Sequence, residues 1–304
     1  MTVLVYSEQT KLASELVSAA FKLSDSVYAL SLNNTVQAEE LSARGVQALN
    51  ADVSVVSADT AALAQILEQA AMHCQASVVL ISSEKSDKHL AGRLAQRLQA
   101  GCLTDVEAIT GTRDGAEYTR NALGGATVAV QTILTEKKVV AVAPKAFDPA
   151  PVKDGGSIIV WTPNVPPATV ELLESKIKQV DSVDITAASV LFAVGQGVEQ
   201  ELLSKVQELA RRTGAELACS KPIATDKKWL PEARVVGISG SKCKPDIAVL
   251  FGISGQVQFY VGIRDAKNLF AVNSDENAPI CGLVDYTLIA DAADVIADLQ
   301  TKLS

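Results

Sequence analysis

Short apolar runs alternate with amphipathic stretches along both halves of the chain, and this alternation constrains the fold more than any other feature. In the first half the apolar runs lie at 3–6, 27–32, 53–56 and 77–82, and helix-like stretches follow them. The last of these stretches, 87–98, has leucines four residues apart on one face. Alternating strands and helices predict a parallel sheet with right-handed crossovers that place helices on its faces.

The first half departs from this alternation after residue 106. Residues 106–144 contain three strand-like segments, EYTRNALGG, TVAVQTIL and KVVAVAP, with Gly124 and Gly125 in their midst. Short strands joined through glycines predict an antiparallel edge or hairpin added to the sheet. Residues 147–156 and 162–167 are rich in proline and glycine, so we expect connectors there.

The second half repeats the alternation. The predicted elements are strands at 189–194, 216–219, 235–236, 247–252, 269–273 and 283–290, and helices at 199–213, after Ser254 and at 294–303. A chain of 304 residues is long enough for two cores. We therefore expect an α/β protein of two domains, each a largely parallel sheet flanked by helices. Residues 1–183 would form the first domain and residues 184–304 a doubly wound second domain.

The composition excludes several classes of function. A net charge of −8 with scattered basic residues argues against nucleic-acid binding. No apolar run reaches the roughly 18 residues that a membrane span needs, and residues 3–6 are typical of a strand rather than of a signal peptide. We therefore expect a cytoplasmic protein without membrane insertion. The five cysteines form no C-x-x-C pair, so we expect neither a disulfide framework nor a zinc site.

Two glycine-rich turns mark the candidate site. Residues 235–262 contain two apolar runs that each end in Gly-Ile-Ser-Gly, at 237–240 and 252–255. At the carboxyl end of a parallel strand, such a turn lets backbone N–H groups approach an anionic ligand. Other strands of this half end at Gly195-Gln196-Gly197, Ser220-Lys221 and Asn273. The pattern predicts a nucleotide or dinucleotide site, although similar turns occur in sheets that bind nothing.

Two other functions fit parts of the pattern less well. Residues 195–197 follow a strand, as in an NAD-binding fingerprint, but position 200 is glutamine where the third glycine belongs. A serine nucleophile in a Gly-x-Ser-x-Gly turn needs glycine where Gln256 or Ser241 stands, and both histidines lie far upstream. Lys221 fits a solvated surface lysine and a cofactor contact about equally well.

A series of segments spread in order along nearly the whole chain matches one family. These segments are HLAGRLAQRLQAGCLTDVEAI (89–109), YTRNALGGATVAV (118–130), ELACSKPIA (216–224), KWLPEARVVGISG (228–240), FGISGQVQFYVG (251–262), FAVNSDENAPI (270–280) and VDYTLIAD (284–291). Through them the chain resembles the alpha subunit of electron transfer flavoproteins, in particular the FixB-like branch. The resemblance implies a heterodimer with a beta subunit. This chain would bind the beta subunit through its first domain and its interdomain cleft.

The resemblance also implies an electron carrier rather than an enzyme with its own substrate. FAD in the second domain would accept electrons from a dehydrogenase, of the acyl-CoA dehydrogenase type used in fatty acid oxidation, and pass them to an acceptor. The expected cofactor contacts are Gln196, Ser220, Lys221, Gly237, Ile238, Ser239, Gly240, Ser254, Gly255, Gln256, Val257, Gln258, Phe259, Asn273, Asp291 and Ala292. No catalytic residue and no metal ligand is expected.

The resemblance assigns roles to several of these residues. Residues 254–258 match the turn that holds the pyrophosphate and ribityl chain, and Ser239 matches a hydroxyl near the flavin N5. Ser220 matches a serine close to the flavin, whereas Asn273 and Asp291 match contacts to the ribose or adenine end.

Four positions depart from the family pattern. The family usually has arginine at Gln196 and Lys221, glutamine at Ile238 and histidine at Phe259. Reduced flavin gains negative charge that a cation or donor stabilises, and phenylalanine cannot donate a hydrogen bond. One hypothesis is that FAD binds with a lowered reduction potential. Another is a diverged member that holds FAD weakly or holds another adenine nucleotide as a scaffold, and an NAD-dependent oxidoreductase is a further alternative.

Overall fold

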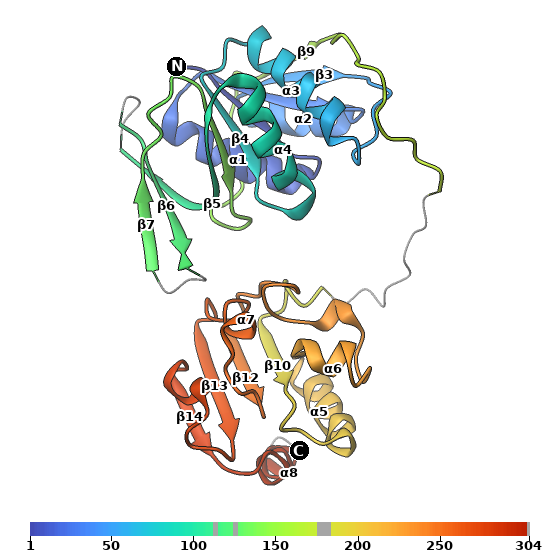
Figure 1. Cartoon of the computed structure of the whole chain (residues 1–304), viewed down its shortest axis with the longest axis vertical. Helices are drawn as coiled ribbons and strands as arrows, with labels where there is room; N and C mark the ends of the chain where they lie inside the picture. Colours follow the sequence, from blue (N-terminus) through green and yellow to red (C-terminus); the bar gives the residue numbers. More distant parts are fainter. Residues whose placement is uncertain (112–114, 124–126, 175–183, 303–304) are drawn as a thin grey trace. The chain divides into compact units, whose positions relative to one another are not determined.

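The computed structural model divides the chain into two compact units, Met1–Ser175 and Lys176–Ser304, each built around its own sheet (Figure 1). It describes residues 1–302 except 112–114, 124–126 and 175–183. The expected domain boundary between residues 183 and 184 falls at the end of the last gap, so it stays a prediction. Among the described residues, no helix is both long and apolar enough to cross a lipid bilayer.

Unit 1 has a nine-stranded sheet in its described residues, in the order β7-β6-β5-β8-β4-β1-β2-β3-β9. Its elements are β1 (Val3–Tyr6), α1 (Thr10–Leu23), β2 (Val27–Leu32), α2 (Thr35–Ser42), β3 (Gln47–Ala51), α3 (Thr60–His73), β4 (Val78–Ser82), α4 (Lys85–Leu98), β5 (Gly101–Thr110), β6 (Glu117–Ala122), β7 (Thr127–Gln131), β8 (Lys138–Val142) and β9 (Ser157–Val160). Neighbouring strands pair in parallel except β6, which is antiparallel to β5 and to β7. The predicted parallel sheet with an antiparallel addition is therefore confirmed.

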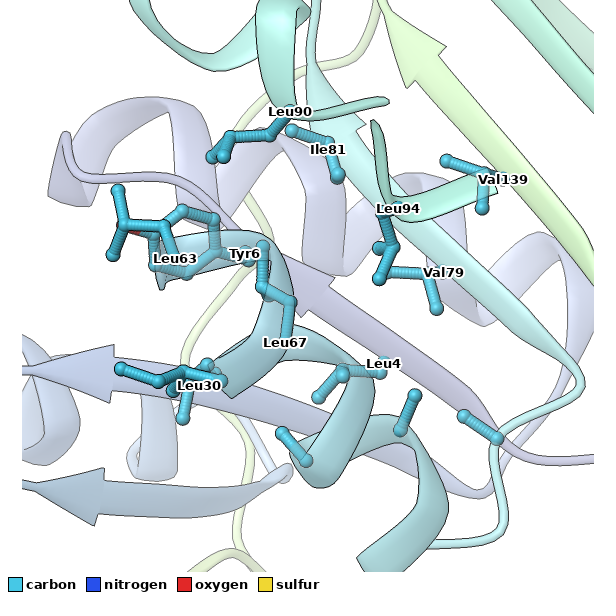
Figure 2. Close-up of a cluster of buried hydrophobic side chains, with 14 of the residues drawn as sticks. Leu4, Tyr6, Leu30, Leu63, Leu67, Val79, Ile81, Leu90, Leu94 and Val139 are labelled. Carbon is cyan, nitrogen blue, oxygen red and sulfur yellow. The ribbon is translucent and has the colours of Figure 1, made fainter. Parts of the chain in front are cut away.

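Helices cover both faces of the central strands in unit 1. Leu4 and Tyr6 of β1 face a cluster that contains Leu63 and Leu67 of α3 and Leu90 of α4 (Figure 2). The alternate residues of β1 contribute to a second cluster with α1 on the other side. Because a strand points successive side chains to opposite faces, β1 is apolar throughout and all four of its residues are buried.

Two expectations for unit 1 were wrong in detail. The strand predicted at 53–56 lies instead at β3, where residues 47–51 pair with β2. Val53 does not pair with a neighbouring strand. Its backbone N–H and C=O are instead hydrogen-bonded to the side chain of Asn33. The KVVAVAP segment forms β8, an interior parallel strand between β4 and β5 rather than part of the antiparallel edge. Gly124 and Gly125 lie outside the described residues.

Strand β9 was not predicted from the sequence. This strand follows the predicted connector and pairs in parallel with β3 at the edge of the sheet. Its residues Ser157 and Val160 are exposed, so it lacks the buried apolar pattern by which the other strands were predicted.

Unit 2 has a five-stranded, all-parallel sheet in its described residues, in the order β11-β10-β12-β13-β14. Its elements are β10 (Val190–Val194), α5 (Gln200–Thr213), β11 (Glu216–Cys219), α6 (Lys221–Thr225), η2 (Glu232–Arg234), β12 (Ile247–Phe251), α7 (Val257–Tyr260), β13 (Asn268–Asn273), η3 (Pro279–Gly282), β14 (Tyr286–Ile289) and α8 (Ala292–Lys302). Helices α5 and α8 pack on one face, and residues such as Phe259, Ile263 and Ile280 cover the other. The doubly wound sheet is confirmed.

The differences in unit 2 concern short elements. The predicted strand at 235–236 is a pair of isolated bridges, in which Val235 pairs with Cys219 and Val236 with Ser241. The segment after β11, for which no helix was predicted, contains α6 and η2. The helix predicted after Ser254 is the single turn of α7, and β14 is shorter than the predicted 283–290.

Candidate functional site

A cavity of 460 Å³ lies at the carboxyl ends of the strands in unit 2. This is the edge at which open α/β sheets bind their ligands, and the volume lies in the usual range for small-molecule and cofactor sites. The lining residues are Gly195, Gln196, Gly197, Ser220, Lys221, Pro222, Val236, Gly237, Ile238, Ser239, Gly252, Ile253, Ser254, Gln256, Gln258, Phe259, Asn273, Asp275 and Ala278.

The structure brings most of the predicted site residues together around this cavity. Those in the lining are Gln196, Ser220, Lys221, Gly237, Ile238, Ser239, Ser254, Gln256, Gln258, Phe259 and Asn273. Gly240, Gly255, Val257, Asp291 and Ala292 lie outside the lining. Asp291 instead receives a hydrogen bond from the backbone N–H of Ala293, 2.7 Å away. The roles of all these residues toward a cofactor stay predictions.

Glycines let three turns of the cavity wall approach one another. A Cβ atom on Gly195 would lie 2.2 Å from the carbonyl oxygen of Gly252, and one on Gly255 would lie 2.2 Å from the backbone nitrogen of Ile280. Gly252 and Gly255 also have positive φ angles of 59° and 90°. Larger residues would therefore force the backbone apart and strain these turns.

The two Gly-Ile-Ser-Gly turns are joined directly through the segment that follows the second one. The backbone N–H of Ile238 donates to the carbonyl oxygen of Gln258 at 2.8 Å. A Cβ atom on Gly237 would lie 2.5 Å from that same oxygen. The repeated sequence motif thus marks two backbone turns that together form one wall of the cavity.

The wall leaves hydrogen-bonding groups without partners. Ser220 lines the cavity, and its hydroxyl oxygen is buried without a hydrogen-bond partner within the described chain. Within the part of the chain that the structure describes, the backbone N–H groups of Ser254, Gln256 and Gln258 also have no acceptor. Buried polar groups are normally paired in proteins, so the Ser220 hydroxyl indicates a place for a polar ligand.

Asn273 also has a structural role in the wall of the cavity. Its amide nitrogen donates to the carbonyl oxygen of Ile253 at 2.9 Å, and its amide oxygen accepts from the backbone N–H of Asp275 at 3.0 Å. Asn273 therefore ties together two loops that line the cavity. One of its two amide hydrogens remains for a ligand.

The charged and apolar groups of the lining set what the cavity can accept. Among the described lining residues, Lys221 carries the positive charge and Asp275 the negative charge, and both side chains are exposed. Phe259 is 7% exposed and belongs to the apolar core, whereas Ile238 is 55% exposed.

Burial raises the pKa of the nearby Cys219 thiol to about 12, so this thiol stays protonated at neutral pH.

Four lining residues were not singled out from the sequence: Pro222, Val236, Asp275 and Ala278. Four others, Gly195, Gly197, Gly252 and Ile253, belong to the turns that the sequence marked, although they were not among the expected cofactor contacts. The glycines carried a usable signal, because they stand at strand ends in short glycine-rich turns. Asp275 and Ala278 could have been found by following the chain past the end of β13. Gln200, which replaces the third glycine of an NAD fingerprint, is the first residue of α5.

Comparison with known proteins identifies the class of protein that this fold and cavity define. The family model of the electron transfer flavoprotein domain matches residues 3–168, and that of the electron transfer flavoprotein FAD-binding domain matches residues 184–264. The chain belongs to the electron transfer flavoprotein family, and it carries the FAD-binding domain of the alpha type.

Particular relatives match the chain over almost its entire length. It is 31% identical over 310 aligned residues to Protein FixB of Escherichia coli (strain 55989 / EAEC), covering 99% of this chain and 97% of that protein. It is 30% identical over 310 residues to Protein FixB of Shigella flexneri, with the same coverage. The resemblance to the alpha subunit and its FixB-like branch is thus confirmed.

The cofactor of this domain is FAD, and the cavity fits such a ligand on structural grounds. FAD carries a pyrophosphate, for which the free amides of residues 254–258 offer donors. Its polar groups offer partners to the Ser220 hydroxyl. The close-packed glycine turns leave backbone rather than side chains at the wall, as dinucleotide sites require.

Proposed function

We propose that this chain is the alpha subunit of a heterodimeric electron transfer flavoprotein. Bound FAD supplies the redox chemistry, because its ring system accepts and releases electrons. The protein would carry electrons from a dehydrogenase, of the acyl-CoA dehydrogenase type, to an acceptor in fatty acid oxidation, without turning over a substrate of its own. A beta subunit would contact unit 1 and complete the complex.

The single observation that supports this proposal best is the cavity of unit 2 with its unpartnered donors. In our proposal the amides of Ser254, Gln256 and Gln258 bind the cofactor phosphates, and the Ser220 hydroxyl binds a polar group of the same ligand. Ser239 supplies an exposed hydroxyl, and Lys221 supplies a positive charge for an anionic ligand.

Electron transfer itself provides the test of this function. The chain is co-expressed with its beta subunit, and the purified complex is mixed with an acyl-CoA dehydrogenase and its acyl-CoA substrate. We expect the visible absorbance of the oxidised flavin to bleach only when both dehydrogenase and substrate are present. Bleaching by NADH alone, at a comparable rate, would instead support the oxidoreductase alternative.

A diverged nucleotide-binding scaffold is the second candidate, because two lining positions at which the family usually has polar donors carry apolar side chains here. Ile238 and Phe259 present apolar groups in the lining, and Phe259 cannot donate a hydrogen bond to a reduced flavin. In an active member these residues would lower the reduction potential of FAD. Redox titration of the complex, compared with Phe259→His, tests this: the variant should show the higher potential.

Titration with FAD and with ADP separates the two candidates. An electron carrier should bind FAD more tightly than ADP, because the flavin half adds contacts that ADP lacks. Equal affinity for the two ligands, or tighter binding of ADP, would favour the scaffold.

A further inference from the structure

The two Gly-Ile-Ser-Gly turns of unit 2 have the same sequence but different backbone structures. The first turn, 237–240, closes on itself, because the N–H of Gly240 donates to the carbonyl oxygen of Gly237 at 3.1 Å. The second turn, 252–255, whose four residues are all described, has no such internal bond, and its two glycines have φ angles of 59° and 90°. Since the sequence of the turn is the same in both places, contacts from elsewhere must hold the second turn in its conformation.

These contacts are made to the carbonyl groups of the second turn. Each carbonyl oxygen from residue 252 to residue 254 accepts a hydrogen bond from another part of unit 2. The three donors, one for each carbonyl in order, are the backbone N–H of Gly197 at 3.0 Å, the side-chain amide of Asn273 at 2.9 Å and the backbone N–H of Ile280 at 3.2 Å. Two of these donors are backbone groups, so Asn273 is the contact of the three that a side-chain substitution can remove.

Asn273 is a fixed donor, because both its backbone and its side chain are held in place. Its backbone pairs with Ile289 of β14, and its carbonyl oxygen accepts the N–H of Ala290 at 3.1 Å. Its amide oxygen accepts the N–H of Asp275 at 3.0 Å. The amide oxygen is thereby kept on the side of Asp275, which leaves the amide nitrogen for the carbonyl oxygen of Ile253.

The hydrogen bond from Asn273 also orients an N–H group. The carbonyl of Ile253 and the N–H of Ser254 belong to one planar trans peptide group, in which these two bonds point in opposite directions. A carbonyl held at Asn273 therefore turns the N–H of Ser254 away from Asn273. Among the described residues this N–H has no acceptor, and Ser254 is exposed and lines the cavity. The N–H groups of Ile253 and Gly255 likewise lack acceptors in the described chain.

We propose that Asn273 is a positioning residue for an anion-binding turn. By holding the carbonyl of Ile253, it keeps the N–H of Ser254, between those of Ile253 and Gly255, available to a phosphate group. Successive free N–H groups of this kind form concave sites for anions. The inference rests on the proposed function, which places cofactor phosphates at Ser254, and it adds the side chain that keeps this turn in its binding conformation.

Loss of this hydrogen bond should weaken phosphate binding without any change in the turn itself. Glycines 252 and 255 flank the peptide group between Ile253 and Ser254, and glycine permits backbone rotation that other residues resist. Once released, the peptide group can rotate and present its carbonyl oxygen to the ligand in place of its N–H. A carbonyl oxygen carries a partial negative charge, so it repels a phosphate group that the N–H would bind.

Asn273→Ser is the variant that tests this role. A serine hydroxyl can still accept the N–H two residues further on, so the contact to Asp275 is retained, but serine is too short to reach Ile253. The binding of FAD, ADP and riboflavin is measured on the heterodimer freed of flavin. FAD and ADP share a pyrophosphate, which riboflavin lacks. We expect the affinities for FAD and ADP to fall by at least about tenfold each, and the affinity for riboflavin to stay unchanged.

Asn268, at the other end of β13, provides the matched control. Its side-chain amide donates to the carbonyl oxygen of Asp246 at 3.1 Å, and it lies outside the cavity lining. Asn268→Ser therefore removes a hydrogen bond of the same kind from the same strand, away from the cavity. All three affinities should stay at their original values in this control.

Hydrogen exchange of the flavin-free heterodimer tests the positioning without a ligand. The N–H of Ile280 donates to the carbonyl oxygen of Ser254, in the peptide group next to the one that Asn273 holds. We expect this N–H to exchange several-fold faster in Asn273→Ser, because the turn is less firmly held, and at the original rate in Asn268→Ser. Unchanged exchange in Asn273→Ser would contradict the positioning role.

The binding results separate this inference from the proposed function. Unchanged affinities for FAD and ADP in Asn273→Ser would overturn the inference and leave the proposed function standing. An equal loss for FAD, ADP and riboflavin would also overturn it, because the variant would then have deformed the whole cavity. If the unaltered heterodimer bound neither FAD nor ADP, the proposed function and the inference would both fail.

Discussion

The two units share one architecture, yet the carboxyl ends of their parallel strands are built in opposite ways. In unit 1 the strand ends are closed by buried polar side chains. Ser7 donates to Asp87 at 2.6 Å, and Gln37 accepts a hydrogen bond from Ser31 and donates to the carbonyl oxygen of Ser7. In unit 2 the corresponding edge has glycine turns, together with backbone amides and a serine hydroxyl that have no partner among the described residues.

This difference shows what separates a structural sheet edge from a ligand site. Unit 1 also has a cavity at its strand ends, of 380 Å³, but Asn33, Asn34 and Gln37 in its lining already bind other parts of the chain. Polar groups that are satisfied internally have little to offer a ligand. The parallel sheet provides the location, and the glycine turns with free donors provide the binding capacity.

The largest expected effect comes from filling a glycine turn of unit 2. Gly255→Ala places a Cβ atom 2.2 Å from the backbone nitrogen of Ile280 at a φ of 90°. We expect loss of bound flavin and destabilisation of unit 2 by more than about 3 kcal/mol, because both the clash and the positive φ must be relieved. Flavin content and thermal unfolding measure the two effects.

Gly282→Ala is the matched control for this variant. Its added Cβ atom would meet nothing within 4 Å, so flavin content and stability should stay near the original values. Equal flavin content in both alanine variants would show that the turn is not needed for binding.

The next effect should fall on unit 1 alone. Ser7→Ala removes the hydroxyl that donates to the buried Asp87 carboxylate. Loss of a hydrogen bond to a buried charged group should cost about 1–3 kcal/mol of unfolding free energy. Denaturant unfolding followed by hydrogen exchange should locate this loss in unit 1, with FAD affinity unchanged. A large drop in FAD affinity would mean that the two strand edges are not independent.

Reversing the charge of Lys221 should weaken binding of the cofactor. Lys221→Glu places a carboxylate in a lining that already contains Asp275. We expect roughly tenfold weaker FAD binding at low salt and a smaller difference at high salt, because salt screens exposed charges. Lys242→Glu, an exposed lysine outside the lining, is the control in isothermal titration. Identical salt dependence in both variants would remove Lys221 from the site.

The smallest expected effect is also the most specific one. Because the Ser220 hydroxyl has no partner in the described chain, Ser220→Ala should leave the ligand-free protein as stable as before or slightly more stable. FAD affinity should nevertheless fall several-fold, as expected for the loss of one hydrogen bond. Thermal unfolding with and without FAD separates the two. A loss of stability without ligand would indicate a structural hydroxyl instead.

The sequence predicted those parts of the fold that bury their apolar residues. Strand β2 was predicted with the bounds that the structure shows, since its residues alternate between two covered faces. Strand β3 was missed because QALNA is only partly apolar, while the neighbouring Val53 and Val55 are buried without being in a strand. Strand β8 was predicted as a strand but with the wrong neighbours. A strand can be recognised from its local sequence, whereas its pairing partners are set by contacts distant in sequence.

The candidate site divides in the same way. Local turn chemistry indicated Ser239 and Ser254, because a glycine-rich turn at a strand end can be recognised within a few residues. The hydrogen bonds by which Asn273 connects two loops could not be predicted, since they depend on how these separate loops meet. The absence of an internal partner for Ser220 is likewise a property of the folded chain, and no short motif records it.

The FAD content of the purified heterodimer tests the central claim most directly. The chain is co-expressed with its beta subunit, and the visible spectrum is recorded after excess FAD is removed. The account predicts one FAD bound through the cavity of unit 2 in each heterodimer, and its loss in Gly255→Ala but not in Gly282→Ala. A colourless heterodimer, or flavin that is retained in Gly255→Ala, would contradict it.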